Sequence, residues 1–188
     1  RFKARKAHLQ DVLSSFFDIS PQLVIEKKKL PTGLFDISAV SPPDKLDELK
    51  TRFVETLGTN LEVSLLVKTQ AVEVYVMTVC ASNAPGLKPS EKRIGGGGRP
   101  GGFTLNGSKP EGIASFLEYA LDKPVIDETG LTGLWAADIR WEMSKSELSR
   151  RSADPAKLIR AAREQLGLEL KWVKRELPVL VVERPVRP

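Results

Sequence analysis

Cysteine and histidine are almost missing from this chain of 188 residues, which has one of each, Cys80 and His8. A single cysteine excludes an internal disulfide and a zinc site built from several cysteines, and a single histidine excludes every site that needs two. Long hydrophobic runs are also missing, because stretches such as 179–182 span only a few residues. This excludes a transmembrane helix. We expect no metal, no cofactor and no membrane insertion of this segment.

Positive charge exceeds negative charge only modestly, with 29 lysines and arginines against 24 acids and a net charge of +5. The excess lies at the N-terminus and in the glycine-rich stretch 85–110, rather than along one predicted element. A nucleic-acid-binding module gathers its basic residues on one face. We therefore do not expect nucleic acid as the partner, and keep weak binding through the basic tail and the segment 85–101 as an alternative.

What the sequence does contain is one internal repeat. The segment 32–35, Thr-Gly-Leu-Phe, is matched one hundred residues later by 132–135, Thr-Gly-Leu-Trp. A short β-branched strand precedes each copy, and apolar residues at helical spacing precede each strand, over 9–17 and 113–121. Five apolar positions on one helical face are typical of an amphipathic helix.

The repeat continues on the C-terminal side of these segments. A second helix follows in each copy and is expected to end at Gly58 and at Gly167, where a left-handed C-cap favours glycine. Two strands are expected to close each copy: 61–67 and 72–77 in the first, and 168–173 and 179–182 in the second. We predict an α+β protein of two tandem, similar units, each β-α-β-β-α-β-β with two helices packed on small sheets.

The expected boundaries follow from composition. The first unit is expected over 1–84 and the second over 102–188. Between them, 85–101 is rich in glycine, proline and basic residues and is typical of a flexible linker. Its glycine run is not a phosphate-binding loop, because Arg99-Pro100 follows the glycines instead of Lys-Ser or Lys-Thr. A polar insertion at 144–152 is expected on the surface.

No catalytic constellation is evident in the sequence. Asp127-Glu128-Thr129-Gly130 is similar to the Asp-Thr-Gly of aspartic proteases, but Glu128 interrupts the turn, and the matching segment 29–31 has no acid to complete a dyad. No spacing requires Cys80 and His8 to meet as nucleophile and base. Trp141 has no counterpart in the first copy and is a candidate binding aromatic. We assign no catalytic and no metal-ligating residue.

Several segments resemble one bacterial family. The segments 124–134 and 164–170, with 179–185 and 87–90, are similar to the uncharacterised "soil-associated protein" family of Acidobacteria and related bacteria. The resemblance covers nearly the whole chain, departs at 24–34 and 144–152, and supplies no activity. It implies an extracytoplasmic setting. The order of elements in each unit also resembles the short N-terminal domain of secretins and TonB-dependent transducers, which docks on a neighbouring protein.

These observations favour a non-catalytic binding or docking module. Because the chain begins at Arg1 without a methionine, we expect it to be part of a larger extracytoplasmic or membrane-attached bacterial protein. A protein or peptide would bind by strand addition at an exposed edge, or in a groove between the units. Trp141, Val179 and Val181 are the candidate contacts. A hydrolase whose carboxylates the spacing does not reveal is the enzyme alternative.

Overall fold

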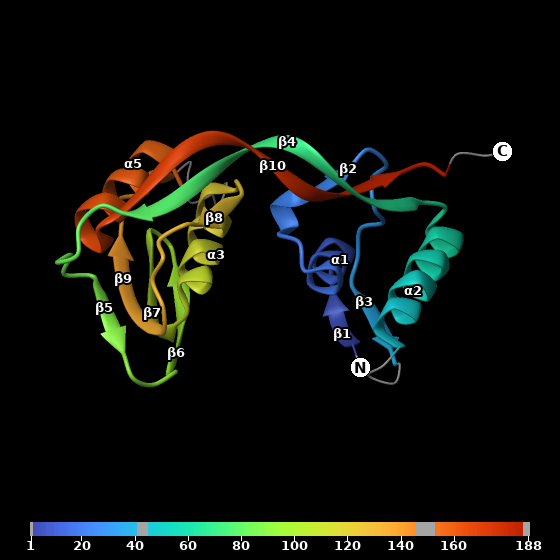
Figure 1. Ribbon diagram of the computed structural model, residues 1–188, viewed down its shortest axis with the longest axis horizontal. Helices are drawn as coiled ribbons and strands as arrows, with labels where there is room; N and C mark the ends of the chain where they lie inside the picture. Colours follow the sequence, from blue (N-terminus) through green and yellow to red (C-terminus); the bar gives the residue numbers. More distant parts are fainter. Residues whose placement is uncertain (1, 41–44, 146–152, 186–188) are drawn as a thin grey trace. The chain divides into compact units, whose positions relative to one another are not determined.

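The computed structural model describes residues 2–40, 45–145 and 153–185, so most of the expected insertion at 144–152 lies outside the described chain. The described residues form a mixed α+β protein, which confirms the predicted class. Two compact units are present: unit 1 contains Arg1–Ala71 and Glu176–Pro188, and unit 2 contains Val72–Arg175. The chain passes between them within two long strands, β4 (Ser64–Val79) and β10 (Leu168–Glu183) (Figure 1).

These long strands differ from the prediction. Each region is predicted as two strands, 61–67 and 72–77 in the first and 168–173 and 179–182 in the second. The structure instead has one continuous strand in each place, in which the central polar residues are mostly exposed. Since each long strand contributes to both units, the units also differ from the expected ranges 1–84 and 102–188.

Unit 1 begins with β1 (Phe2–Ala7), which pairs antiparallel with β3 (Phe35–Ala39) as a two-stranded sheet. Between them lie α1 (Leu9–Phe17), the short 3-10 helix η1 (Pro21–Leu23) and β2 (Val24–Glu26). β2 pairs in parallel with the C-terminal half of β10, with Val24 opposite Leu180. The helix α2 (Leu46–Leu61) then leads into β4.

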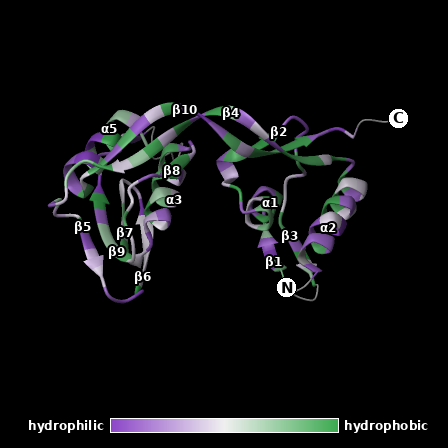
Figure 2. Ribbon diagram, viewed as in Figure 1, coloured by the Kyte–Doolittle hydropathy of each residue, from purple (hydrophilic) through white to green (hydrophobic). Residues whose placement is uncertain are grey.

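The core of unit 1 is built on the predicted helical periodicity. Leu9, Val12 and Leu13 on α1 are buried, and the ring of Phe16 stacks on that of Phe53 from α2 with centroids 3.8 Å apart. Figure 2 shows that α2 carries both hydrophobic and hydrophilic residues, as expected for a helix with one covered face.

The end of α2 corrects one prediction. The helix continues past Gly58 to Leu61, and its left-handed C-cap is Glu62, with φ of 51°. The predicted glycine cap is correct at Gly167, where φ is 65° and an added Cβ would lie 2.2 Å from the Ala81 carbonyl oxygen. Glycine is therefore required at Gly167 both by the backbone conformation and by its neighbour.

Unit 2 contains a four-stranded sheet in the order β5-β9-β7-β6, in which every neighbouring pair is antiparallel (Figure 1). Its strands are β5 (Leu87–Ser90), β6 (Gly95–Arg99), β7 (Gly102–Ser108) and β9 (Leu134–Arg140). The other elements are α3 (Pro110–Leu121), β8 (Val125–Asp127), and α5 (Pro155–Ala161) with the π-helical turn η3 (Ala162–Leu166). β8 pairs in parallel with β4, with Val125 opposite Tyr75.

The segment 85–101 forms sheet structure and not only a connection. It supplies β5 and β6, the two edge strands of the unit 2 sheet. A Cβ at Gly96 would lie 2.3 Å from the carbonyl oxygen of Thr104, so a glycine there lets β6 approach β7 closely. Pro100 and Gly101, with φ of 71° at Gly101, turn the chain from β6 into β7.

The core of unit 2 is mainly aliphatic. Ile113 and Leu117 of α3, Ile139 of β9 and Leu158 of α5 are completely buried together with Phe103 of β7. Full burial of one such side chain contributes about 1.5–3 kcal/mol. None of the helices in the described part of the chain has the length and hydrophobicity needed to span a membrane.

Candidate functional site

Unit 2 contains an open groove of about 660 Å³. This volume is in the usual range of small-ligand and side-chain pockets, about 300–1,000 Å³. Residues of the β6–β7 hairpin, of one face of α3 and of the chain after β9 line the groove. The larger residues among them are Arg99, Phe103, Phe116, Tyr119, Trp141 and Met143. We refer to these six residues and the space between them as the aromatic groove.

The apolar wall of the aromatic groove follows from helix geometry. Phe116, Tyr119 and Ala120 lie at i, i+3 and i+4 on α3, so they share one face of the helix. The ring of Phe116 packs on that of the buried Phe103, with centroids 5.3 Å apart. Tyr119, one turn further, is 71% exposed. The wall therefore runs from the core of the unit out to solvent.

Trp141, the aromatic residue predicted from the sequence, lies on this groove. Its backbone N–H donates to the carbonyl of Gly101 at 2.8 Å. Its indole Nε1 is buried and has no hydrogen-bond partner among the described residues. A buried donor without an acceptor costs about 1–3 kcal/mol, so such groups are rare and call for an explanation.

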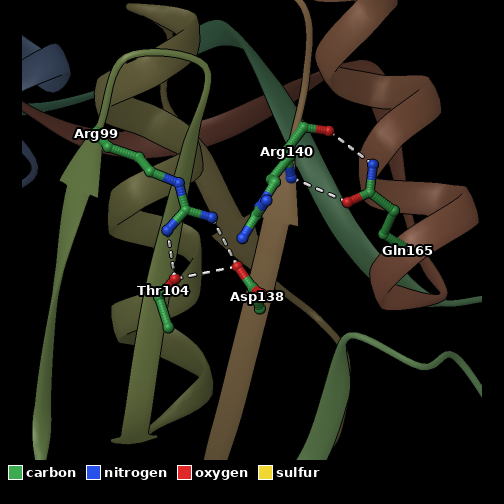
Figure 3. Close-up of polar contacts among 5 residues, drawn as sticks. All are labelled: Arg99, Thr104, Asp138, Arg140 and Gln165. Atoms are coloured by element: carbon green, nitrogen blue, oxygen red, sulfur yellow. Dashed lines mark hydrogen bonds and ion pairs between the residues drawn. The ribbon is translucent and has the colours of Figure 1, made fainter.

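A polar network joins Arg99, at the end of β6, to β7 and β9 (Figure 3). Arg99 donates through Nη1 to Thr104 Oγ1 at 2.7 Å and through Nη2 to Asp138 Oδ1 at 2.8 Å, and the Thr104 hydroxyl donates to the same carboxylate oxygen at 3.0 Å. The three residues belong to β6, β7 and β9, so the network ties β6 across the sheet. It fixes the position of the Arg99 side chain.

The network also sets the charge of Asp138. The hydrogen bond from Arg99 lowers the pKa of this carboxyl below its ordinary value, and the Thr104 hydroxyl and the charge of Arg140 act in the same direction. Asp138 is therefore a carboxylate near neutral pH and has no proton to give as a general acid.

A second pair of contacts holds the chain just before Trp141. The Gln165 side chain accepts from the Arg140 backbone N–H at 2.9 Å and donates to the Arg140 carbonyl at 2.6 Å (Figure 3). Gln165 thus pairs with the end of β9 as a neighbouring strand would. The sequence analysis missed this role, because a glutamine in a helical segment carries no signal of a tertiary contact.

Val179 and Val181, the other predicted contact residues, are not at an exposed edge. Their exposed fractions are 0% and 1%. They belong to β10, which lies between β2 and β4 in the sheet order β2-β10-β4-β8. A strand paired on both sides offers no free backbone groups to a partner.

Asp127, Cys80 and His8 are the other residues that the sequence analysis considered as candidates. Asp127 Oδ1 accepts from the backbone N–H of Thr129 at 2.9 Å and from its hydroxyl at 2.7 Å, which is a side-chain-stabilised turn. Cys80 is exposed, and His8 is the N-cap residue of α1 without a side-chain capping bond. In the ranges that the structure describes, no three His, Cys, Asp or Glu residues are grouped as metal ligands.

Comparisons with known proteins are consistent with an uncharacterised domain. Neither a search of curated proteins nor a search of solved structures found a match. A family model described as a protein of unknown function, DUF3738, matches residues 10–184. This confirms the expectation of a domain of unknown function over nearly the whole chain. The chain therefore belongs to the DUF3738 family.

Proposed function

We propose that this chain is a non-catalytic binding module whose ligand site is the aromatic groove of unit 2. The observation that carries the proposal is a groove of about 660 Å³ whose open wall is made of aromatic side chains. Large exposed aromatic surface in a concave site is typical of binding surfaces in soluble domains. The groove is suited to an apolar group.

Two adjacent glycines allow a direct test. A Cβ at Gly98 would lie 3.5 Å from Cε1 of Phe116, an ordinary contact, so a longer side chain there would extend over the aromatic groove. A Cβ at Gly97 would have no atom within 4 Å, and successive side chains of a strand point to opposite faces. Gly98→Leu should fill the groove, and Gly97→Leu is its matched control.

The measurement is binding of the protein and both variants to an array of capped octapeptides with apolar residues at alternate positions. We expect the wild type and Gly97→Leu to bind a common set of peptides, and Gly98→Leu to lose them by about tenfold or more, the equivalent of about 1.4 kcal/mol. Binding that is equal in both variants, or no binding to any peptide, would contradict the proposed site.

We further propose that the chain is a duplication whose halves exchange strands. Two features support this. The pairs β1–β3 and β7–β9 are both antiparallel and both flank a helix and a short strand. The short strand β2 of the first half pairs with β10 of the second, and β8 of the second half pairs with β4 of the first. A structure-based superposition of 2–79 on 102–183 is the test, and unrelated connectivity would contradict it.

The cellular setting is a separate part of the proposal. The resemblances to the "soil-associated" family and to the secretin and TonB short domain support a docking role in a larger protein outside the cytoplasm. Fractionation of cells that express the full parent protein with an epitope tag tests this. Recovery of the tagged protein in the envelope or periplasm supports the setting, and recovery in the cytoplasm contradicts it.

A further inference from the structure

We infer that the ligand of the aromatic groove is an extended peptide, which adds as a fifth strand to the free edge of β6 and places an apolar side chain in the groove. This inference rests on the proposed function and specifies its ligand. Strand addition takes its affinity from backbone hydrogen bonds and its selectivity from pockets for alternate side chains. Both requirements are met at one margin of the unit 2 sheet.

The two edges of this sheet are not alike. β5, at one edge, has Lys88 and Pro89, and lysine and proline are the residues that protect natural sheet edges from further pairing. β6, at the other edge, has four consecutive glycines followed by Arg99, and all five residues are exposed. Arg99 is turned to Thr104 and Asp138 and does not guard the edge. Among the residues that the structure describes, none covers the edge of β6, which is therefore open to pairing.

The packing of unit 2 does not require all of these glycines. Gly96 is required by the Thr104 carbonyl, and Gly95 has φ of 105°, a conformation that favours glycine. Gly97 and Gly98 have no positive φ, and an added Cβ would meet nothing within 4 Å at Gly97 and only the Phe116 ring at Gly98. Side chains of a strand stand out of the plane of the sheet, whereas an added strand pairs within that plane. The backbone edge of β6 is therefore accessible to an incoming strand whichever residue stands at Gly97.

The edge and the groove are continuous. Gly98 and Arg99 at the end of β6 line the aromatic groove together with Phe116 and Tyr119. A strand added along β6 would present a side chain to this face at every second residue, about 7 Å apart. An extended peptide supplies both the backbone for the edge and the apolar side chain for the groove.

The test uses the full chain and the octapeptide that binds it most tightly in the array described above. Each peptide nitrogen is N-methylated in turn, and the affinity of each derivative is measured by titration. A bound strand donates alternate N–H groups to its neighbour. We expect methylation at every second position to weaken binding about tenfold or more, and methylation at the positions between to have little effect. Amide exchange should slow at alternate residues of 95–99 when the peptide is bound.

The outcomes separate this inference from the proposed function. Binding that is sensitive to Gly98→Leu, without alternation along the peptide and without slower exchange in β6, would keep the groove and overturn strand addition. Absence of peptide binding would overturn both. Slower exchange in β6 at high protein concentration without peptide, together with a dimer in sedimentation, would make a second copy of this chain the occupant and overturn the inference of a separate ligand.

Discussion

Units 1 and 2 each contain an antiparallel strand pair, and the two pairs have different surroundings. In unit 1, β1 and β3 form a sheet of two strands. In unit 2, the pair β7–β9 has β6 on one side and β5 on the other, both from the segment that connects β4 with β7. The aromatic groove uses the end of β6. A glycine-rich connection can therefore line a groove when it is held as an edge strand.

The cores of the two units also differ. Unit 1 packs the rings of Phe2, Phe16 and Phe53 against one another, whereas the residues that unit 2 buries completely are mainly aliphatic. Aromatic side chains that reach solvent in unit 2 line its groove instead. Phe103 and Phe116 belong to both sets, so the groove of unit 2 is continuous with its core.

The largest effect is expected in the core of unit 2. Leu117 of α3 is completely buried in this core, so Leu117→Ala should lower the free energy of unfolding by about 2–5 kcal/mol through lost burial and the cavity that remains. Leu34→Ala in unit 1 is the control, because Leu34 is 60% exposed, and it should change stability by about 0.5 kcal/mol or less. Urea denaturation measures both. Similar losses of unfolding free energy in the two variants would contradict the assigned core.

A smaller effect on stability is expected for substitutions of Gly96 and Gly97 in β6. Gly96→Ala places a Cβ at 2.3 Å from the Thr104 carbonyl oxygen, so β6 must shift, at a cost of about 1–3 kcal/mol. Gly97→Ala meets no atom and should leave stability unchanged or raise it by about 0.4–1 kcal/mol. Thermal unfolding of the two variants is the measurement. Equal melting temperatures would mean that β6 does not pack on β7 as described.

Two tryptophans of unit 2 provide the next comparison. Trp135 Nε1 donates to the Thr132 carbonyl at 3.0 Å, so Trp135→Phe removes a hydrogen bond and should cost about 0.5–1.5 kcal/mol. Trp141→Phe removes a buried donor that has no partner, which offsets the lost ring contacts, so its cost should be smaller. Denaturant titration of both variants measures the difference. A larger loss for Trp141→Phe would show that its indole N–H is satisfied in the protein.

The smallest effect concerns pH. The folded-state pKa of Asp138 is lowered by Arg99, so its stabilising contribution is present above the unfolded pKa of about 3.9 and is lost as the pH falls through the folded value. Because the pair is exposed and screened, Asp138→Asn should cost less than about 1 kcal/mol near neutral pH and nothing in strong acid. Denaturation curves recorded near neutral pH and in strong acid measure this difference in stability. Arg99→Gln should show the same trend, and a cost independent of pH would exclude this ion pair as its cause.

Local pattern predicted the helices better than the strands. The apolar spacing of 9–17 coincides with α1, and that of 113–121 falls within α3, because helical hydrogen bonds join neighbours in the chain. The predicted aromatic contact Trp141 lies on the groove, although its unpartnered nitrogen could not be foreseen. The buried positions of Val179 and Val181 were missed, since they depend on both strands that flank β10.

The amino-acid sequence alone determined the α+β class, the amphipathic helices and the absence of a cysteine or histidine cluster, because these depend on composition and on contacts between near neighbours. Only the tertiary structure decided that 64–79 and 168–183 are single strands, that Gly95-Gly96-Gly97-Gly98 is an edge strand, and that Arg99, Thr104 and Asp138 meet. A strand obtains its hydrogen bonds from partners far away in the chain, so its identity and its free edge exist only once those partners are in place.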